Sequence, residues 1–74
     1  MGKKRKLRNL TAREVLDILK RDGWYEVAQK GSHVQLKHPE KKGKITVSVH
    51  KGKVLPIGTI KSIFKQAGIE DVED

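Results

Sequence analysis

Apolar positions in two parts of the chain recur with the period of an α-helix. The first stripe follows Thr11, which has capping-box spacing with Glu14 and is expected to begin a helix that ends at Gly23 in a left-handed conformation. Its apolar members are Ala12, Val15, Leu16 and Leu19. The second stripe follows Pro56, which suits the first turn of a helix, and ends at Gly68. Its apolar members are Ile60, Ile63, Phe64 and Ala67.

Between these two helices the pattern changes to the alternation that is typical of β-strands. Strands are predicted over residues 24–29, 33–38 and 44–50. The apolar side chains that alternate toward a core are Val34, Leu36, Ile45, Val47 and Val49. The alternation is imperfect in the first strand, so the facing of Trp24 and Tyr25 stays open, with one of the two expected to be a core anchor.

The order helix, strand, strand, strand, helix predicts an α+β fold, with a three-stranded antiparallel sheet and two helices on one face. The other face is left to solvent. Its predicted residues are all polar: His33, Gln35, Lys37, Lys44, Thr46, Ser48 and His50. We expect residues 1–9 to form a flexible basic arm, 10–69 the domain and 70–74 an acidic tail. A chain this small has little room for a deep cavity, so an active site is expected on an open surface.

The expected register brings two histidines together on that open face. Inward residues must pair with inward residues, because a slip of one position turns a whole strand over. The shortest reasonable turn then places Leu36 opposite Val47 and Val34 opposite Val49. His33 is thereby expected opposite His50, with Cβ atoms about 4.5–5.5 Å apart. A slide of two residues makes the pair diagonal, still within reach of long side chains.

Charge narrows the choice of partner. Basic residues outnumber acidic ones by 17 to 9, which gives a net charge of +8 and a pI of about 10. Nine of the basic residues lie between Lys30 and Lys65, where Glu40 is the one acid, whereas the last five residues hold four acids. This asymmetry favours a nucleic-acid partner. An acidic membrane surface also attracts such a charge. A simpler interpretation is that the lysines only keep the protein soluble.

Histidines among lysines are suited to cutting RNA without a metal. In that reaction the 2′-hydroxyl attacks the adjacent phosphate, which requires a base, an acid for the leaving 5′-oxygen and positive charge around the phosphate. Histidine titrates near neutral pH and serves as base or acid. A noncatalytic RNA-binding surface uses the same lysines. Two histidines are also half of a metal site, but no carboxylate lies nearby in the pattern, so we expect no metal and no cofactor.

The composition also bears on location. The chain has no cysteine, which excludes disulfides and cysteine-ligated zinc and fits a reducing cytoplasm. No apolar run approaches the roughly 20 residues of a membrane span. The basic start of the chain is not followed by the apolar segment of a secretory signal. We therefore expect a cytoplasmic protein without a membrane partner.

Several segments together resemble one protein family. They are Gln29-Lys30-Gly31-Ser32-His33, His38-Pro39, the run from Val47 to Lys53, and the run from Pro56 to Ile69. Over roughly residues 11–69 the chain resembles the HicA family of messenger-RNA-cleaving toxins. A lone Gly-Ser-His is a weak signal, but its spacing to the second-helix segment makes the resemblance specific. The basic run from Lys3 to Arg8 is longer than most members of the family carry before the first helix.

The resemblance implies a fold like that of double-stranded-RNA-binding domains and a toxin that cleaves mRNA independently of the ribosome. It implies that His33 is catalytic, and it leaves His50 as a secondary candidate. The residues expected to contact single-stranded RNA are Lys30, Gly31, Ser32, Lys37, Lys44 and Lys51. The implied protein partner is a HicB-type antitoxin that covers the active site.

Two other functions stay open when the residues are taken alone. The first is a noncatalytic RNA-binding domain of the same architecture, which binds RNA with steep salt dependence and leaves it intact. The second is an interaction protein whose basic face serves an acidic protein partner. That protein has no affinity for RNA at physiological salt.

Overall fold

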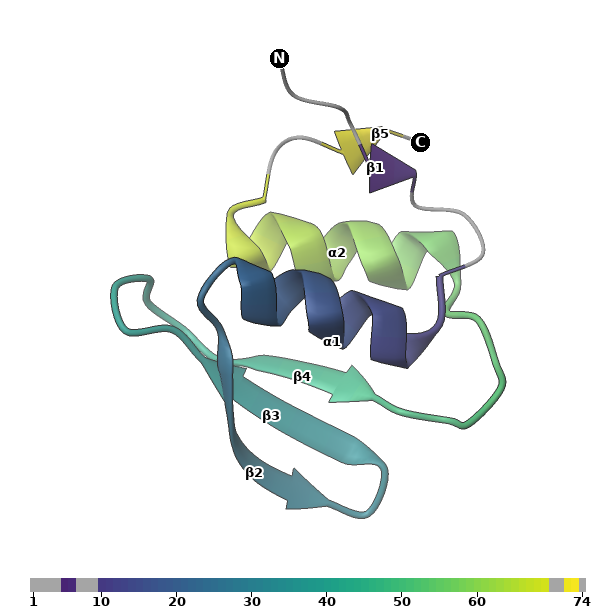
Figure 1. Cartoon of the computed structure of the whole chain (residues 1–74), viewed down its shortest axis with the longest axis horizontal. Helices are drawn as coiled ribbons and strands as arrows, with labels where there is room; N and C mark the ends of the chain where they lie inside the picture. Colours follow the sequence, from purple (N-terminus) through teal and green to yellow (C-terminus); the bar gives the residue numbers. More distant parts are fainter. Residues whose placement is uncertain (1–4, 7–9, 70–71, 74) are drawn as a thin grey trace.

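The computed structural model of the chain has two helices on one side of a three-stranded antiparallel sheet, which confirms the predicted α+β class (Figure 1). The structure describes residues 5–6, 10–69 and 72–73, with side chains within 10–69. The helices are α1 (Ala12–Arg21) and α2 (Ile57–Ala67), and the strands are β1 (Arg5–Lys6), β2 (Tyr25–Lys30), β3 (His33–Lys37), β4 (Ile45–Ser48) and β5 (Val72–Glu73). The three-stranded sheet has the order β2-β3-β4.

The short strands near the chain ends form a separate two-stranded pair. β1 and β5 run parallel, with Arg5 opposite Val72 and Lys6 opposite Glu73. The rest of the predicted basic arm and acidic tail lies outside the described residues.

Local hydrogen bonds and backbone angles explain where the helices begin and end. The Thr11 Oγ1 accepts from the Glu14 amide at 3.2 Å, and the Glu14 carboxylate accepts from the Thr11 amide at 2.8 Å, so the predicted capping box is confirmed. α1 ends at the C-cap Asp22, and Gly23 follows with a φ of +109°. Pro56 is the N-cap of α2 rather than part of its first turn, and Gly68 ends that helix in the left-handed region.

The register between β3 and β4 differs from the one expected from the sequence. The paired residues are His33 with Ser48, Val34 with Val47, Gln35 with Thr46, and Leu36 with Ile45. The predicted pairing of His33 with His50 is therefore wrong by two residues, although the faces were assigned correctly. The strands are also shorter than predicted, since β3 spans His33–Lys37 and β4 spans Ile45–Ser48 instead of 33–38 and 44–50, so the connection between them is longer than expected.

A set of side-chain hydrogen bonds holds this connection, residues 38–44, in place. The His38 Nδ1 accepts from the amides of Glu40 and Lys41 at 3.0 and 3.1 Å, which folds the turn back on itself. The Lys41 ammonium donates to the Asp22 carboxylate at 2.5 Å and to the Ala67 carbonyl at 2.7 Å. The turn is thereby attached to the carboxyl-terminal ends of both helices. The His38 Nε2 is also 2.8 Å from the Asp22 carbonyl oxygen, so this nitrogen carries the proton and donates it.

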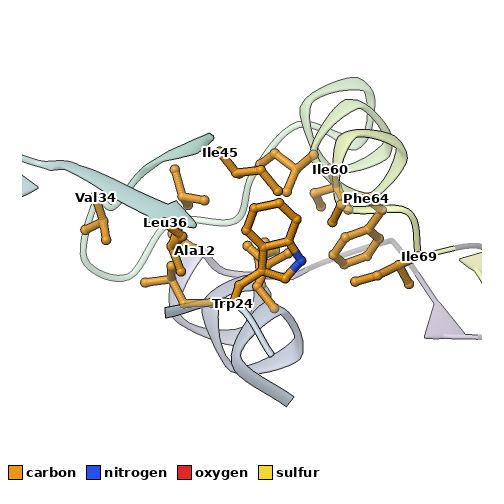
Figure 2. Close-up of a cluster of buried hydrophobic side chains, with 14 residues drawn as sticks. Ala12, Trp24, Val34, Leu36, Ile45, Ile60, Phe64 and Ile69 are labelled. Carbon is orange, nitrogen blue, oxygen red and sulfur yellow. The ribbon is translucent and has the colours of Figure 1, made fainter. Parts of the chain in front are cut away.

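The core lies between the helices and one face of the sheet. Figure 2 shows Trp24 among the side chains of α2 and the sheet, and this residue is 2% exposed. Tyr25, in contrast, is 49% exposed. The core anchor that the sequence left open is therefore Trp24. The remaining buried side chains are Ala12, Val15, Leu16, Leu19, Val34, Leu36, Ile45, Val47, Ile60, Ile63, Phe64, Ala67 and Ile69.

A β-bulge in β2 explains why Trp24 and Tyr25 face as they do. The register between β2 and β3 shifts between Glu26 and Ala28, so one extra residue, Val27, is accommodated there. Strict alternation would place Tyr25 and Ala28 on opposite faces. The extra residue returns Tyr25 to the same face as Ala28, because their partners Lys37 and Gln35 lie on one face of β3.

Candidate functional site

The face of the sheet away from the helices carries a polar row that crosses all three strands. Lys30 of β2 is directly opposite His33 of β3, and His33 is directly opposite Ser48 of β4. Directly opposed residues project from the same face with Cβ atoms about 4.5–5.5 Å apart. We call these three residues the His33 row. It places a cation on one side of an imidazole and a hydroxyl on the other.

Two further rows continue this face away from His33. Ala28, Gln35 and Thr46 form the next row, and Tyr25 with Lys37 forms the one after it. No carboxylate belongs to these described rows. The nearest acid on β2, Glu26, pairs with the inward residue Leu36 and forms an ion pair of 2.7 Å with Lys20 of α1. Its charge is therefore directed to the helix side of the sheet.

The three histidines of the chain have different surroundings. His38 is half-buried, hydrogen-bonded through both ring nitrogens and in edge contact with Trp24 at a ring-centroid distance of 5.3 Å. Its ring is thus part of the fold. His33 and His50 are exposed. His33 lies within regular sheet, where the backbone determines the direction of its side chain.

The turn before His33 is built from backbone interactions. Gly31 has a φ of +61°, a conformation that suits glycine, and its carbonyl accepts from the Gln29 side-chain amide at 3.1 Å. The Ser32 carbonyl accepts from the Val49 amide at 2.7 Å. The turn therefore holds the first residue of β3 against the end of β4, which fixes the backbone position of His33.

His50 and Lys51 lie beyond the end of β4. His50 is two residues past Ser48, so it is not the residue opposite His33. Both line a shallow hollow of about 220 Å³ beside the start of α1. Its other lining residues are Thr11, Ala12, Arg13, Val49 and Gly52. The structure thus brings Lys30 and His33 directly together, and it places His50 and Lys51 in a neighbouring hollow.

The remaining candidates, Lys37 and Lys44, lie at the end of the polar face away from His33. Lys37 is exposed two rows from His33, and Lys44 is exposed immediately before β4. Ser48 was identified from the sequence only as one polar residue of this face. The alternation in its strand gave its facing, but its position next to His33 depends on the register.

Two further features of the described residues bear on the chemistry. In the part of the chain that is described, no three His, Cys, Asp or Glu side chains are grouped so that they could hold a metal ion. Neither α1 nor α2 has the length and apolar character needed to cross a membrane. What the His33 row offers is a proton-transfer group between a cation and a hydroxyl on an open surface.

Comparison with protein families places the chain among known proteins. A family model described as the HicA toxin of bacterial toxin–antitoxin matches residues 12–69, which include both helices and all three strands of the main sheet. No curated protein matches the chain.

Proposed function

The chain belongs to the HicA toxin family of bacterial toxin–antitoxin systems, and we propose that it is an endoribonuclease that cuts mRNA with His33 as its catalytic residue. The observation that carries this proposal is the His33 row. An exposed imidazole stands between Lys30 and Ser48, on a sheet face whose described rows carry no carboxylate. Such a face attracts the phosphates of RNA and presents a proton-transfer group to them.

The proposed reaction uses the RNA's own 2′-hydroxyl as the nucleophile. A bond forms between the 2′-oxygen and phosphorus, and the bond from phosphorus to the 5′-oxygen breaks. The 2′-hydroxyl loses its proton to a base, and the leaving 5′-oxygen gains one from an acid. His33 performs one of these two transfers, since histidine serves either role near neutral pH. The products are a 2′,3′-cyclic phosphate and a free 5′-hydroxyl.

Neighbouring groups support the phosphate during this reaction. Lys30 supplies positive charge beside His33, and the Ser48 hydroxyl is placed to donate a hydrogen bond from the opposite side. We assign the wider RNA contact to the turn residues Gly31 and Ser32 and to the exposed lysines. These lysines are Lys37, Lys44 and Lys51. His50 remains a secondary candidate for acid–base chemistry or phosphate binding, acting from the hollow beside α1.

The family suggests the biological setting of this chemistry. We propose a cytoplasmic toxin that stops translation and growth by cutting mRNA, restrained by a HicB-type antitoxin that covers the His33 face. A noncatalytic RNA-binding domain is the alternative, because the lysines of the same face also serve simple binding.

Expression in a bacterial host separates these two functions. We expect the wild-type chain to arrest growth, and we expect His33→Ala, or co-expression of the antitoxin, to restore it. A His33→Ala chain that is expressed, folded and as toxic as the wild type would contradict the assignment of His33.

A further inference from the structure

One aromatic side chain lies on the same face as the His33 row. The chain has one tryptophan, one phenylalanine and one tyrosine. Trp24 and Phe64 are 2% and 1% exposed, so neither ring is available to a ligand. Tyr25 is 49% exposed. It is opposite Lys37, a residue on the same side of β3 as His33.

We propose that Tyr25 is a base-stacking residue, and that the open face of the sheet is a track for single-stranded RNA running from His33 to Tyr25. This inference rests on the proposed function, because it names how the same face holds its substrate. Stacking needs an unpaired base whose ring is accessible, as in single strands and loops. Tyr25 therefore selects a single-stranded substrate.

The spacing separates the tyrosine from the chemistry. Lys37 and His33 are four residues apart along β3, and a strand rises about 3.3 Å per residue, so their rows lie about 13 Å apart. Tyr25 consequently contacts a nucleotide some distance along the strand from the cut bond. Gln35 lies midway between these rows and is able to hydrogen-bond a base edge.

The charge on this face favours RNA as the occupant of the track. Lys30 is beside His33 at one end of the track, and Lys37 is beside Tyr25 at the other. A lysine next to an exposed aromatic ring binds a phosphate while the ring stacks on the neighbouring base. Proteins that bind single-stranded nucleic acids combine these two kinds of contact. The paired strands keep Glu26 on the opposite side, where it is bound to Lys20.

Binding measured without cleavage tests this inference. Proteins carrying His33→Ala, which keeps the RNA intact, are titrated in EDTA against a fluorescently labelled single-stranded RNA, and anisotropy gives the dissociation constant. Adding Tyr25→Leu is expected to weaken binding roughly tenfold, as for loss of one stacked base. Tyr25→Phe keeps the ring and is expected to retain the affinity. Val54→Ala, at a 53% exposed residue in the loop before α2, is the matched control and is expected to change nothing.

A scan with single abasic sites identifies the stacked base. An abasic site at one position is expected to weaken RNA binding by the His33→Ala protein. The same abasic site is expected to have no further effect on binding once Tyr25→Leu is also present. A fully duplexed RNA of the same sequence is expected to bind both proteins equally. Far-ultraviolet circular dichroism and Trp24 fluorescence verify that each variant is folded. The abasic scan of the His33→Ala protein tests the stacking even if Tyr25→Leu fails to fold.

The outcomes also separate this inference from the proposed function. Unchanged affinity on Tyr25→Leu, an equal loss with duplex RNA, or no binding of RNA at all would overturn the role of Tyr25. If the wild type shows the Tyr25 effect but never cuts the RNA, the stacking residue stands and the nuclease assignment fails.

Discussion

Ser48 lies directly opposite His33 across the β3–β4 pair. The sequence pattern had placed His50 opposite His33, and a serine in that position changes the chemistry expected at the site. Two opposed imidazoles would divide the roles of acid and base between them. A serine beside one imidazole is instead suited to orient the phosphate, since a neutral hydroxyl is a weak acid and base but a good hydrogen-bond donor.

The first prediction compares these two neighbours of His33. We expect Ser48→Ala to lower the rate of RNA cutting roughly tenfold, because one hydrogen bond to a charged phosphate is lost. His50→Ala is expected to have a smaller effect, since His50 lies two residues further along the chain from the row. Single-turnover cleavage of a labelled RNA by each variant measures the two rates. A larger loss in His50→Ala would return the second catalytic role to His50.

A second prediction concerns the positive charge beside His33. Lys30→Ala is expected to weaken RNA binding and to reduce the slope of log affinity against log salt by about 0.7, the value for one phosphate contact on a single strand. Lys65→Ala is the matched control, because Lys65 is also exposed but lies in the last turn of α2. The slopes come from titrations between low and physiological salt. Equal slopes for Lys30→Ala and the wild type would remove Lys30 from the RNA contact.

The open face was predictable from the sequence in its composition but not in its pairings. Alternation along β3 and β4 is sufficient to assign His33, Lys37 and Ser48 to one face, because the apolar residues between them must be buried together. Register is a different matter, since a shift of two residues keeps every side chain on its face. The choice between Ser48 and His50 as the partner of His33 therefore required the structure.

Two tertiary features account for what the pattern left open. The β3–β4 connection depends on His38 and Lys41, whose partners Asp22 and Ala67 are distant in the sequence. The bulge at Val27 reverses the alternation of side chains along β2. Neither a long-range hydrogen bond nor a bulge leaves a periodic pattern in the sequence. The sequence alone therefore did not determine which way Trp24 and Tyr25 face.

The third prediction tests the attachment of this connection to α1. Gly23 has a φ of +109°, and a Cβ there would lie 2.6 Å from the His38 Nε2, which is hydrogen-bonded to the Asp22 carbonyl. Gly23→Ala is therefore expected to cost about 1–2 kcal/mol of backbone strain and about 1 kcal/mol more for the displaced hydrogen bond. Urea unfolding followed by Trp24 fluorescence measures the loss.

A second glycine separates the two contributions. Gly43 has a φ of +96°, but a Cβ there would meet nothing within 4 Å. Gly43→Ala is expected to show the backbone strain alone and to be less destabilising than Gly23→Ala. If the two variants lose the same free energy of unfolding, the contact with His38 contributes nothing to stability.

The central measurement is the incubation of purified wild-type protein and of His33→Ala with a long single-stranded RNA in EDTA. We expect the wild type to cut the RNA and the variant to lose at least 100-fold of that rate, on the order of the contribution of one proton-transfer group. His33 is exposed, so the variant is expected to keep the wild-type fold and unfolding midpoint. Cutting by both proteins at one rate, or intact RNA with a folded wild type, would contradict the assignment of His33 as the catalytic residue of a ribonuclease.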